Sequence, residues 1–350
     1  MSDTAHPLLP AATPLLRSPG GGLQVGGVEG GDGVVVSPSP DGLAGLLRGL
    51  DGRRTQRAVL ADAAGQGLDA TAVAAVLDGL RAADLLVDVD AADRLAGDAG
   101  PAAAARSAAE VPFAGSARAR RTAVVLVEGA GRVGTPLAAV LAASGVGRVS
   151  VRDRGPVSAG DAVVGGATAA DEGRPRSLAA ADAVRRANPL ADLRPLPAGT
   201  APDLVVLTRA WAASDPTAAG WARTAIPHLV ATVRGATGIV GPLVVPGATS
   251  CLRCADLHRR DADPRWPDLA AQLTATEPPP SGATVTCLLT AAIAAVQVLA
   301  YLDGSAAPVT LDATLELVPP DLLPRLRRWP GHPECGCGQR TGRPAGDNGP

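Results

Sequence analysis

Residues 122–153 read TAVVLVEGAGRVGTPLAAVLAASGVGRVSVRD, and this stretch decides the fold. An apolar run to Glu128 predicts a strand, the glycine-rich turn 129–134 follows it, and the Ala/Leu-rich segment to Ser144 predicts a helix. A second strand then ends at Asp153. Glycines allow a tight turn and a close approach of the backbone to a phosphate, and the helix N-terminus offers free N–H groups. The sequence therefore predicts a βαβ nucleotide-binding unit.

Three glycines and one acid of this unit have a predicted binding role. Gly129, Gly131 and Gly134 follow the G-x-G-x-x-G spacing, which lets backbone N–H groups approach phosphates. Asp153 stands 19 residues after Gly134, where a carboxylate can accept hydrogen bonds from ribose hydroxyls. The glycine spacing alone is weak evidence, but the combination of strand, helix, strand and acid favours a nucleotide site.

The pattern of alternating strands and helices continues to about residue 338. It predicts an α/β domain over 122–338, with a Rossmann-like, doubly wound and mostly parallel sheet. The apolar segment 283–302 is expected to be a buried core helix rather than a membrane span, because it is rich in alanine and threonine and contains Gln297. The other expected elements are strands at 204–208, 228–234 and 239–245, and helices at 176–187 and 211–225.

Residues 7–90 predict a small winged-helix-like α+β domain that precedes the larger one. Leucines and valines at helical spacing indicate three helices, of which the second has Thr55 as its expected N-cap. Residues 91–121 are expected to be a linker with at most one short helix, and residues 339–350 a disordered tail. The expected elements are strands at 23–25, 34–36 and 85–88, and helices at 43–50, 56–64 and 73–80.

Charge and composition exclude several classes of partner. The whole chain of 350 residues has a formal net charge of −2, and residues 1–90 hold six arginines and eleven acids, a net of −5. Binding to nucleic acid or to an anionic membrane requires the opposite sign, so neither is expected. The chain contains no lysine, which excludes any mechanism that needs a lysine ammonium group. No signal peptide is recognised at the N-terminus, so a cytoplasmic location is expected.

The cysteines indicate a metal site. Cys251 and Cys254 form a C-x-x-C pair, and Cys335 and Cys337 form a C-x-C pair far downstream. Two such thiolate pairs can close a tetrahedral site around a structural zinc ion. Because a C-x-C pair is less usual, His332 remains an alternative ligand for one of the cysteines.

Two alternative roles for the cysteines stay open. A redox role for the C-x-x-C pair is weaker, since the pair follows a Pro/Gly loop rather than opening a helix after a strand. Cys287, in the apolar segment, is conceivable as a nucleophile, but a lone cysteine among Ala, Leu and Val is more often a small buried hydrophobic residue.

The order of these motifs resembles the ThiF/MoeB-like adenylyltransferases, relatives of ubiquitin-activating enzymes. This resemblance covers about residues 120–338. It implies binding of ATP and magnesium, adenylation of the C-terminal glycine of a ubiquitin-like carrier, a structural zinc and commonly a homodimer. Carried over by position, the motif glycines would hold phosphates, Asp153 the ribose, and the four paired cysteines the zinc. The motifs that carry the resemblance are, in chain order, the glycine turn 129–134, Asp153, a Gly173-Arg-Pro-Arg-Ser helix start leading to Asn188-Pro189, and the two cysteine pairs.

The chain departs from that family at the residues that handle the triphosphate. Where the family has an Asn-x-x-Arg-Gln run, this sequence has Asp161, Val164 and Gly165. The family's lysine at the next helix start is Arg176, a weak catalytic candidate that keeps the positive charge but not the compact ammonium group. The stretch 208–211 has no acid where the family has one that helps to bind magnesium. Loss of the residues that contact the triphosphate and of the acid that helps to bind magnesium predicts weak or absent adenylation.

The N-terminal domain carries a second, looser resemblance. Leu46-Leu-Arg-Gly-Leu-Asp-Gly-Arg-Arg-Thr55, with short strands before it and amphipathic helices after it, is similar to the PqqD-like domains. These recognise the leader of ribosomally made precursor peptides, usually by adding a peptide strand to a sheet edge. Fusion of the two domains resembles the partner proteins of thiazole/oxazole-forming enzymes, which bind the precursor and present it to a separate YcaO-type cyclodehydratase.

Three functional hypotheses follow. The first is a leader-binding partner protein that has no adenylation activity of its own. The second is an active ATP-dependent adenylyltransferase that uses Arg176 and activates a ubiquitin-like carrier protein. The third, weaker hypothesis is an NAD- or FAD-dependent oxidoreductase, which rests on the glycine turn alone and is disfavoured by the cysteine pairs.

Overall fold

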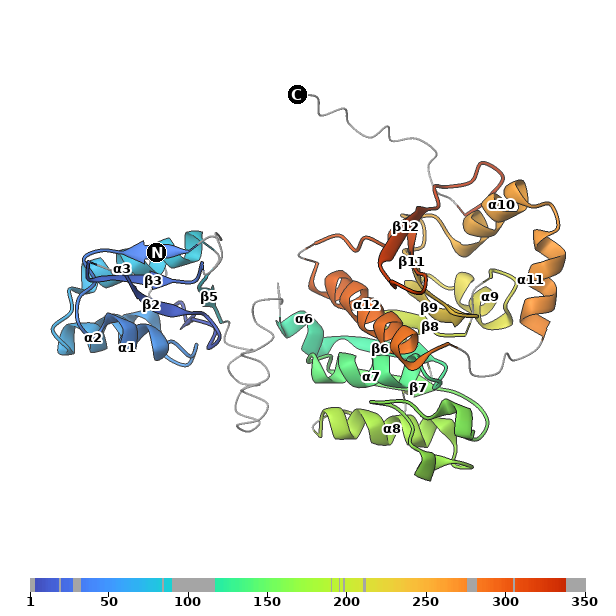
Figure 1. The fold of residues 1–350 in the computed structure, drawn as a ribbon, viewed down its shortest axis with the longest axis horizontal. Coiled ribbons are helices and arrows are strands. Elements are labelled where there is room, and N and C mark those ends of the chain that lie inside the picture. Colours follow the sequence, from blue (N-terminus) through green and yellow to red (C-terminus); the bar gives the residue numbers. More distant parts are fainter. Residues whose placement is uncertain are drawn as a thin grey trace. The chain divides into compact units, whose positions relative to one another are not determined.

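The chain forms two compact units, Met1–Arg118 and Ala119–Pro350 (Figure 1). This computed structural model describes residues 4–18, 20–27, 33–83, 85–89, 117–189, 191–194, 196–197, 199–209, 212–275, 282–304 and 306–337. The predicted tail at 339–350 and most of the predicted linker lie outside these residues. The end of the linker is described, and it forms a short helix, α6 (Ala117–Thr122).

The first unit combines small antiparallel sheets with helices. Strands β2, β3 and β4 pair in that order, and β1 pairs with β5. The hydroxyl of Thr55 accepts a hydrogen bond from Ala58 N at 3.1 Å, which confirms the predicted N-cap of α2. The elements are β1 (Pro7–Leu8), β2 (Leu15–Ser18), β3 (Gly22–Val25), β4 (Val34–Val36), α1 (Leu43–Arg48), α2 (Gln56–Gly65), α3 (Ala70–Ala82) and β5 (Val87–Asp88).

One hydrophobic core and the hydrogen bonds of Arg81 connect the elements of this unit. The predicted helical faces are confirmed, because leucines of α1 and α3 and valines of α2 and β3 pack in a single buried cluster. Arg81 of α3 donates to both carboxylate oxygens of Asp88 in β5 at 2.9 Å and to Gln56 of α2 at 2.6 Å. This arginine therefore ties the last strand of the unit to two of its helices.

The second unit is built on a seven-stranded sheet in the order β12-β11-β10-β9-β8-β6-β7. Strands β7, β6, β8 and β9 are parallel, as predicted, and β10, β11 and β12 extend the sheet with antiparallel pairs. The strands are β6 (Val124–Glu128), β7 (Arg148–Arg152), β8 (Leu204–Leu207), β9 (His228–Arg234), β10 (Thr237–Val244), β11 (Ala313–Leu317) and β12 (Pro324–Arg328).

Helices cover both faces of this sheet, which confirms the Rossmann-like, doubly wound α/β fold. One apolar cluster joins α7 and α12 to the valines and leucines of β6, β8 and β9, and a second joins α9 and α10 to the opposite face of the same strands. The helices after α6 are α7 (Gly134–Ala143), α8 (Arg176–Ala187), α9 (Pro216–Ala222), α10 (Leu252–Ala262), α11 (Trp266–Ala275) and α12 (Thr284–Asp303).

The structure corrects the sequence prediction in several places. The helix expected at 211–225 is shorter, because Asp215 caps α9 by accepting from Thr217 N at 2.8 Å and Pro216 occupies its first turn. Strands β11 and β12 were not predicted, and they lengthen the sheet beyond its parallel part. Strands β1 and β2 and helices α10 and α11 were not predicted either. Cys251 is the N-cap of α10, so the C-x-x-C pair does open a helix, contrary to the prediction.

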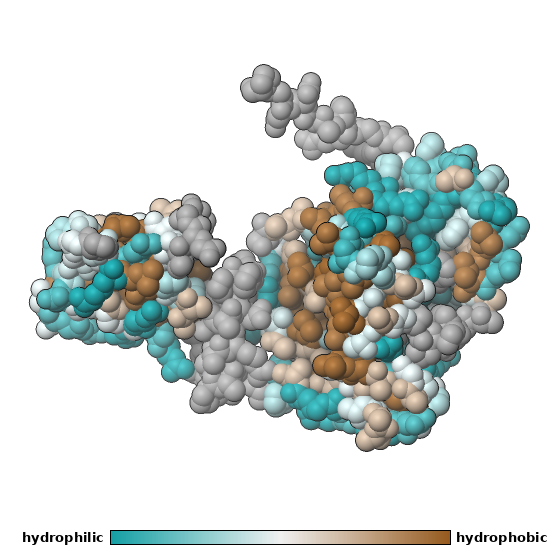
Figure 2. All heavy atoms as spheres, viewed as in Figure 1, coloured by the Kyte–Doolittle hydropathy of each residue, from teal (hydrophilic) through white to brown (hydrophobic). Residues whose placement is uncertain are grey.

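The apolar helix α12 has one buried and one exposed face. By length and composition it is the one helix among the described residues that could cross a membrane, which is weak evidence of a span. Cys287, Ala291 and Val298 on its inner face lie in the core of the sheet, as predicted for a core helix. On its outer face Val285 is 65% and Val296 59% exposed, and Figure 2 shows hydrophobic residues along this helix.

A buried ion pair joins α6 to the end of α12. Arg120 donates from Nε to Asp303 Oδ1 at 2.7 Å and from Nη2 to Oδ2 at 2.6 Å. The side chains of Arg120 and Asp303 are only 3% and 2% exposed. A buried bidentate pair of this kind holds two elements in one geometry, and loss of one partner leaves an uncompensated charge.

Asp303→Asn should therefore lower the free energy of unfolding by about 3–5 kcal/mol, because Arg120 loses its buried counter-charge. Urea denaturation of the full chain would measure this change. Arg185→Gln, which removes an exposed pair with Asp182, should change it by less than about 1 kcal/mol. Equal effects of the two substitutions would contradict the role given to Arg120.

Candidate functional site

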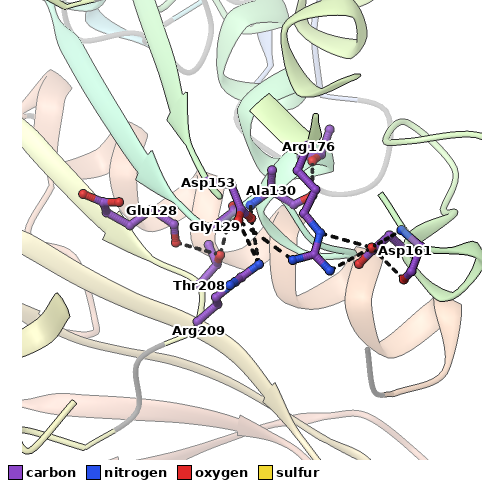
Figure 3. Close-up of polar contacts among 10 residues, drawn as sticks. Glu128, Gly129, Ala130, Asp153, Asp161, Arg176, Thr208 and Arg209 are labelled. Carbon is purple, nitrogen blue, oxygen red and sulfur yellow. Dashed lines mark hydrogen bonds and ion pairs between the residues drawn. The ribbon is translucent and has the colours of Figure 1, made fainter. Parts of the chain in front are cut away.

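The glycine turn lies at the carboxyl end of β6 and leads into α7, as predicted (Figure 3). Gly129 has φ +108, in the left-handed region that favours glycine. A Cβ on Gly134 would lie 1.9 Å from the carbonyl oxygen of Gly129, so this contact requires glycine. Gly131 differs, because a Cβ there would meet no heavy atom within 4 Å. The backbone conformation at Gly129 and the close contact at Gly134 thus shape the turn. At Gly131 the turn is not crowded, so a Cβ there would have space.

The predicted ribose acid, Asp153, lies buried at the end of β7, with 1% of its side chain exposed. Its Oδ2 accepts a hydrogen bond from Ala130 N in the glycine turn at 2.6 Å. Arg209 donates from Nη2 to both carboxylate oxygens, at 2.8 and 3.0 Å (Figure 3). The carboxylate therefore already binds the backbone of the turn and one guanidinium group.

Arg176 lies at the first residue of α8 and contacts a second buried acid. It donates from Nη2 and Nε to Asp161 Oδ2 at 3.0 and 3.2 Å, and its Nη1 lies 3.9 Å from Asp153 Oδ1. Burial raises the pKa of Asp161, but hydrogen bonds from Ser158 and Arg176 outweigh it, so the pKa lies below its ordinary value. The structure thus brings the glycine turn, Asp153 and Arg176 together.

The end of β8 supplies a threonine and an arginine. The hydroxyl of Thr208 donates to the carbonyl oxygens of Glu128 and Gly129 at 2.9 and 3.1 Å and so fixes the start of the turn. Arg209, the next residue, pairs with Asp153. The sequence showed that no acid stands at 208–211, but it gave no signal that Arg209 would meet an acid 56 positions earlier in the chain.

A cavity of roughly 700 Å³ opens at the ends of β6, β7 and β8 and against α9. Its lining includes three arginines and two carboxylates. Glu128 accepts hydrogen bonds from Arg152 at 2.9 Å and from Trp221 Nε1 at 3.1 Å, and burial raises its pKa. Both lining carboxylates are thus bonded to arginine. The charged lining residues are Glu128, Arg152, Asp153, Arg154 and Arg209.

The four paired cysteines meet in one cluster, as their spacing predicts. Their Sγ atoms all lie within 4.8 Å of one another. Neighbouring Sγ atoms are 3.9 Å apart for Cys251 and Cys254, 3.5 Å for Cys251 and Cys335, and 3.6 Å for Cys254 and Cys337. Metal–sulfur bonds of about 2.3 Å in a tetrahedron place sulfurs roughly 3.8 Å apart, so the cluster can hold a metal ion. Burial raises the pKa of Cys251 to about 11, a penalty on the thiolate that a bound cation would offset.

His332 lies beside this cluster but does not belong to it. Its Nε2 bonds to Asp261 Oδ2 at 2.8 Å, and its Nδ1 accepts from Glu334 N at 3.1 Å. Both ring nitrogens therefore have partners, and the set of four sulfurs is complete without the histidine. The alternative in which His332 replaces a cysteine ligand is not favoured by this geometry.

The fold, the glycine turn and the sulfur cluster define a Rossmann-like α/β protein with a cluster of four cysteines. The ThiF family model matches residues 104–337, so the chain belongs to the ThiF family. None of the curated proteins matches the chain.

Solved structures share this fold at low sequence identity. Escherichia coli MccB, the microcin C7 biosynthetic enzyme, in complex with N-formylated MccA, is 15% identical with a TM-score of 0.61, over 95% of this chain and 99% of that one. The same protein with ATP is 15% identical with a TM-score of 0.60 over the same shares. PaaA is 17% identical with a TM-score of 0.56, over 91% of this chain and 99% of that one. At these identities the likeness concerns the fold.

Gly134 is crowded and Gly131 is not, so alanine substitutions at these two positions form a matched test of the described turn. Gly134→Ala should lower the free energy of unfolding by more than about 3 kcal/mol, because its Cβ would collide with the Gly129 carbonyl. Gly131→Ala should change it by less than about 1 kcal/mol. Thermal and urea unfolding would measure both, and a well-tolerated Gly134→Ala would contradict the described turn.

Proposed function

We propose that this ThiF-family protein acts in ribosomal peptide biosynthesis of the thiazole/oxazole type, in the cytoplasm. It binds the leader of a precursor peptide and presents the peptide to a separate YcaO-type cyclodehydratase, without adenylating a substrate itself. The observation that carries the second half of this proposal is the pairing of Asp153 with Arg209 at the end of β8.

The charges of the cavity support the absence of adenylation. Magnesium is held mainly by carboxylates and by the phosphates of its substrate. The carboxylates of the cavity lining, Glu128 and Asp153, are both bonded to arginine. A nucleotide that used Asp153 for its ribose would have to displace Arg209, whose side chain is 35% exposed, from a carboxylate that is 1% exposed, and so break the ion pair of a buried acid.

The first unit supports the binding of a precursor peptide. The solved structures of MccB include complexes with MccA peptides, and the likeness extends over 95% of this chain. Strand β4 is an edge of its three-stranded sheet, α3 lies against it, and Val35 at its centre is 58% exposed. Addition of a leader strand at such an edge is a recurring mode of peptide recognition.

The alternative function is an active adenylyltransferase for the C-terminal glycine of a ubiquitin-like carrier. Three arginines line the cavity, and they would favour an anionic ligand such as a triphosphate. One solved structure of MccB holds ATP. In this alternative Arg209 leaves Asp153 and contacts phosphate, while the motif glycines and Arg176 hold the nucleotide. A homodimer, which the family resemblance implies, is compatible with either function.

Calorimetry with ATP and magnesium separates the two functions. We expect no binding of ATP to the wild-type chain and no ATP–pyrophosphate exchange, because Arg209 is paired with the carboxylate of Asp153. Arg209→Ala should expose Asp153 and permit measurable nucleotide binding, whereas Arg223→Ala, an exposed arginine outside the cavity lining, should not. Micromolar binding by the wild-type chain would refute the proposal and support the adenylyltransferase.

We propose zinc as the metal of the cysteine cluster, since four thiolates are a typical structural zinc site. Purified protein should contain one zinc per chain by elemental analysis. Cys335→Ser should reduce the zinc content and lower the melting temperature, because an incomplete ligand set no longer ties the C-terminal segment to α10. Cys287→Ser, which lies outside the cluster, should leave the zinc content unchanged. Loss of zinc in both variants, or in neither, would contradict the assignment.

A further inference from the structure

Strand β12 is an outer strand of the seven-stranded sheet (Figure 1), and it is exposed along its whole length. It pairs with β11 on one side, and no strand in the described part of the chain pairs with its other side. All five of its residues are exposed, and three of them are arginines. Unpaired backbone groups of an edge strand can accept another strand.

The register of β12 separates its side chains into two faces. Arg325 is paired with Glu316 and Arg327 with Thr314, so these two arginines lie on one face of the sheet. Leu326, between them, points to the opposite face and is 48% exposed. Arg328 shares the face of Leu326, so the edge has two arginines on one face and an exposed leucine beside a third arginine on the other.

The arginines of the cationic face have acids beside them, but in exposed pairs: Arg325 lies 3.2 Å from Asp321 and Arg327 lies 3.7 Å from Glu316, and the two arginine side chains are 60% and 48% exposed. The guanidinium of Arg327 lies 4.3 Å from the centre of the buried Trp329 ring, and that of Arg259 lies 4.6 Å from it. Burial and the charge of Arg327 lower the pKa of Arg234, although Glu316 opposes them. The part of the second unit where Figure 1 places β12 and α10 is largely hydrophilic in Figure 2. Crowded guanidinium groups of this kind favour an anionic partner.

Neither a second copy of β12 nor the C-terminal segment suits this edge by charge. In an antiparallel pair of two β12 strands centred on Leu326, Arg325 of each copy would face Arg327 of the other, and like charges in directly opposite positions are destabilising. The C-terminal residues 338–350 contain two arginines and one aspartate, so their side-chain charge is also positive. Charge complementarity therefore selects a different, acidic occupant.

We propose that the free edge of β12 binds an extended acidic segment of a partner protein as an added strand. Carboxylates at alternate positions of that segment face Arg325 and Arg327, and the apolar residue between them packs against Leu326. This inference does not depend on the proposed function of the first unit or of the nucleotide-binding cavity.

A short labelled peptide in which glutamate alternates with valine tests the proposal by fluorescence anisotropy against the full chain. We expect saturable binding that weakens as salt is added. The double variant Arg325→Glu/Arg327→Glu should bind this peptide roughly tenfold more weakly, since two opposite-charge pairs become like-charge pairs. The same variant should bind a lysine/valine peptide more tightly than the wild-type chain does, which excludes misfolding as the cause.

Two controls address the position and the mode of binding. Arg185→Glu/Arg194→Glu, which reverses two exposed arginines elsewhere in the second unit, should leave the affinity for the glutamate peptide within about twofold. A glutamate peptide with proline at its centre keeps its charge but cannot complete a hydrogen-bonded ladder, so it should bind weakly. Equal binding of the proline peptide, or absence of the charge-swap rescue, would overturn the proposal.

Discussion

The buried carboxylate of Asp153 determines the arrangement of three strand ends in this molecule. A charge with 1% of its side chain exposed must be paired, and its partners come from the glycine turn after β6 and from Arg209 after β8. Arg176 of α8 approaches the same group and balances Asp161. The glycine turn is thus retained, while the acid predicted to bind a ribose is engaged within the protein. Membership of the ThiF family fixes the fold, and the site residues decide what the fold can do.

Much of the framework follows from local sequence patterns. The βαβ unit was predictable because apolar runs, a glycine turn and an Ala/Leu helix each have a short-range cause. Thr55 could be assigned as an N-cap for the same reason, since its hydroxyl serves an N–H only three residues ahead. The cysteine cluster was predictable although its two pairs lie more than 80 residues apart, because two closely spaced thiol pairs strongly favour a shared metal ion.

Other features depend on contacts that no local pattern reveals. Strand β12 has the sequence PRLRR and is exposed throughout, so it lacks the alternation of buried and polar residues by which strands are recognised. The start of α9 depends on competition between a long apolar pattern and the capping preference of Asp215 followed by Pro216. The pairing of Arg209 with Asp153 arises only when β7 and β8 flank β6 in the sheet. The meeting of the four cysteines was therefore better predicted than the pairing of Asp153 with Arg209.

The cysteine cluster also has a consequence for how the chain folds and opens. It joins the start of α10 to the segment after β12, and Cys251 and Cys335 stand 84 positions apart in the chain. Every element between them, α10, α11, α12, β11 and β12, lies inside this closed ring. A metal ion bound by the cluster would keep this ring closed in the unfolded state and so reduce the conformational entropy of the unfolded chain. Fraying from the C-terminus would then stop at Cys337, so the exposed edge strand would persist as long as the ring stays closed.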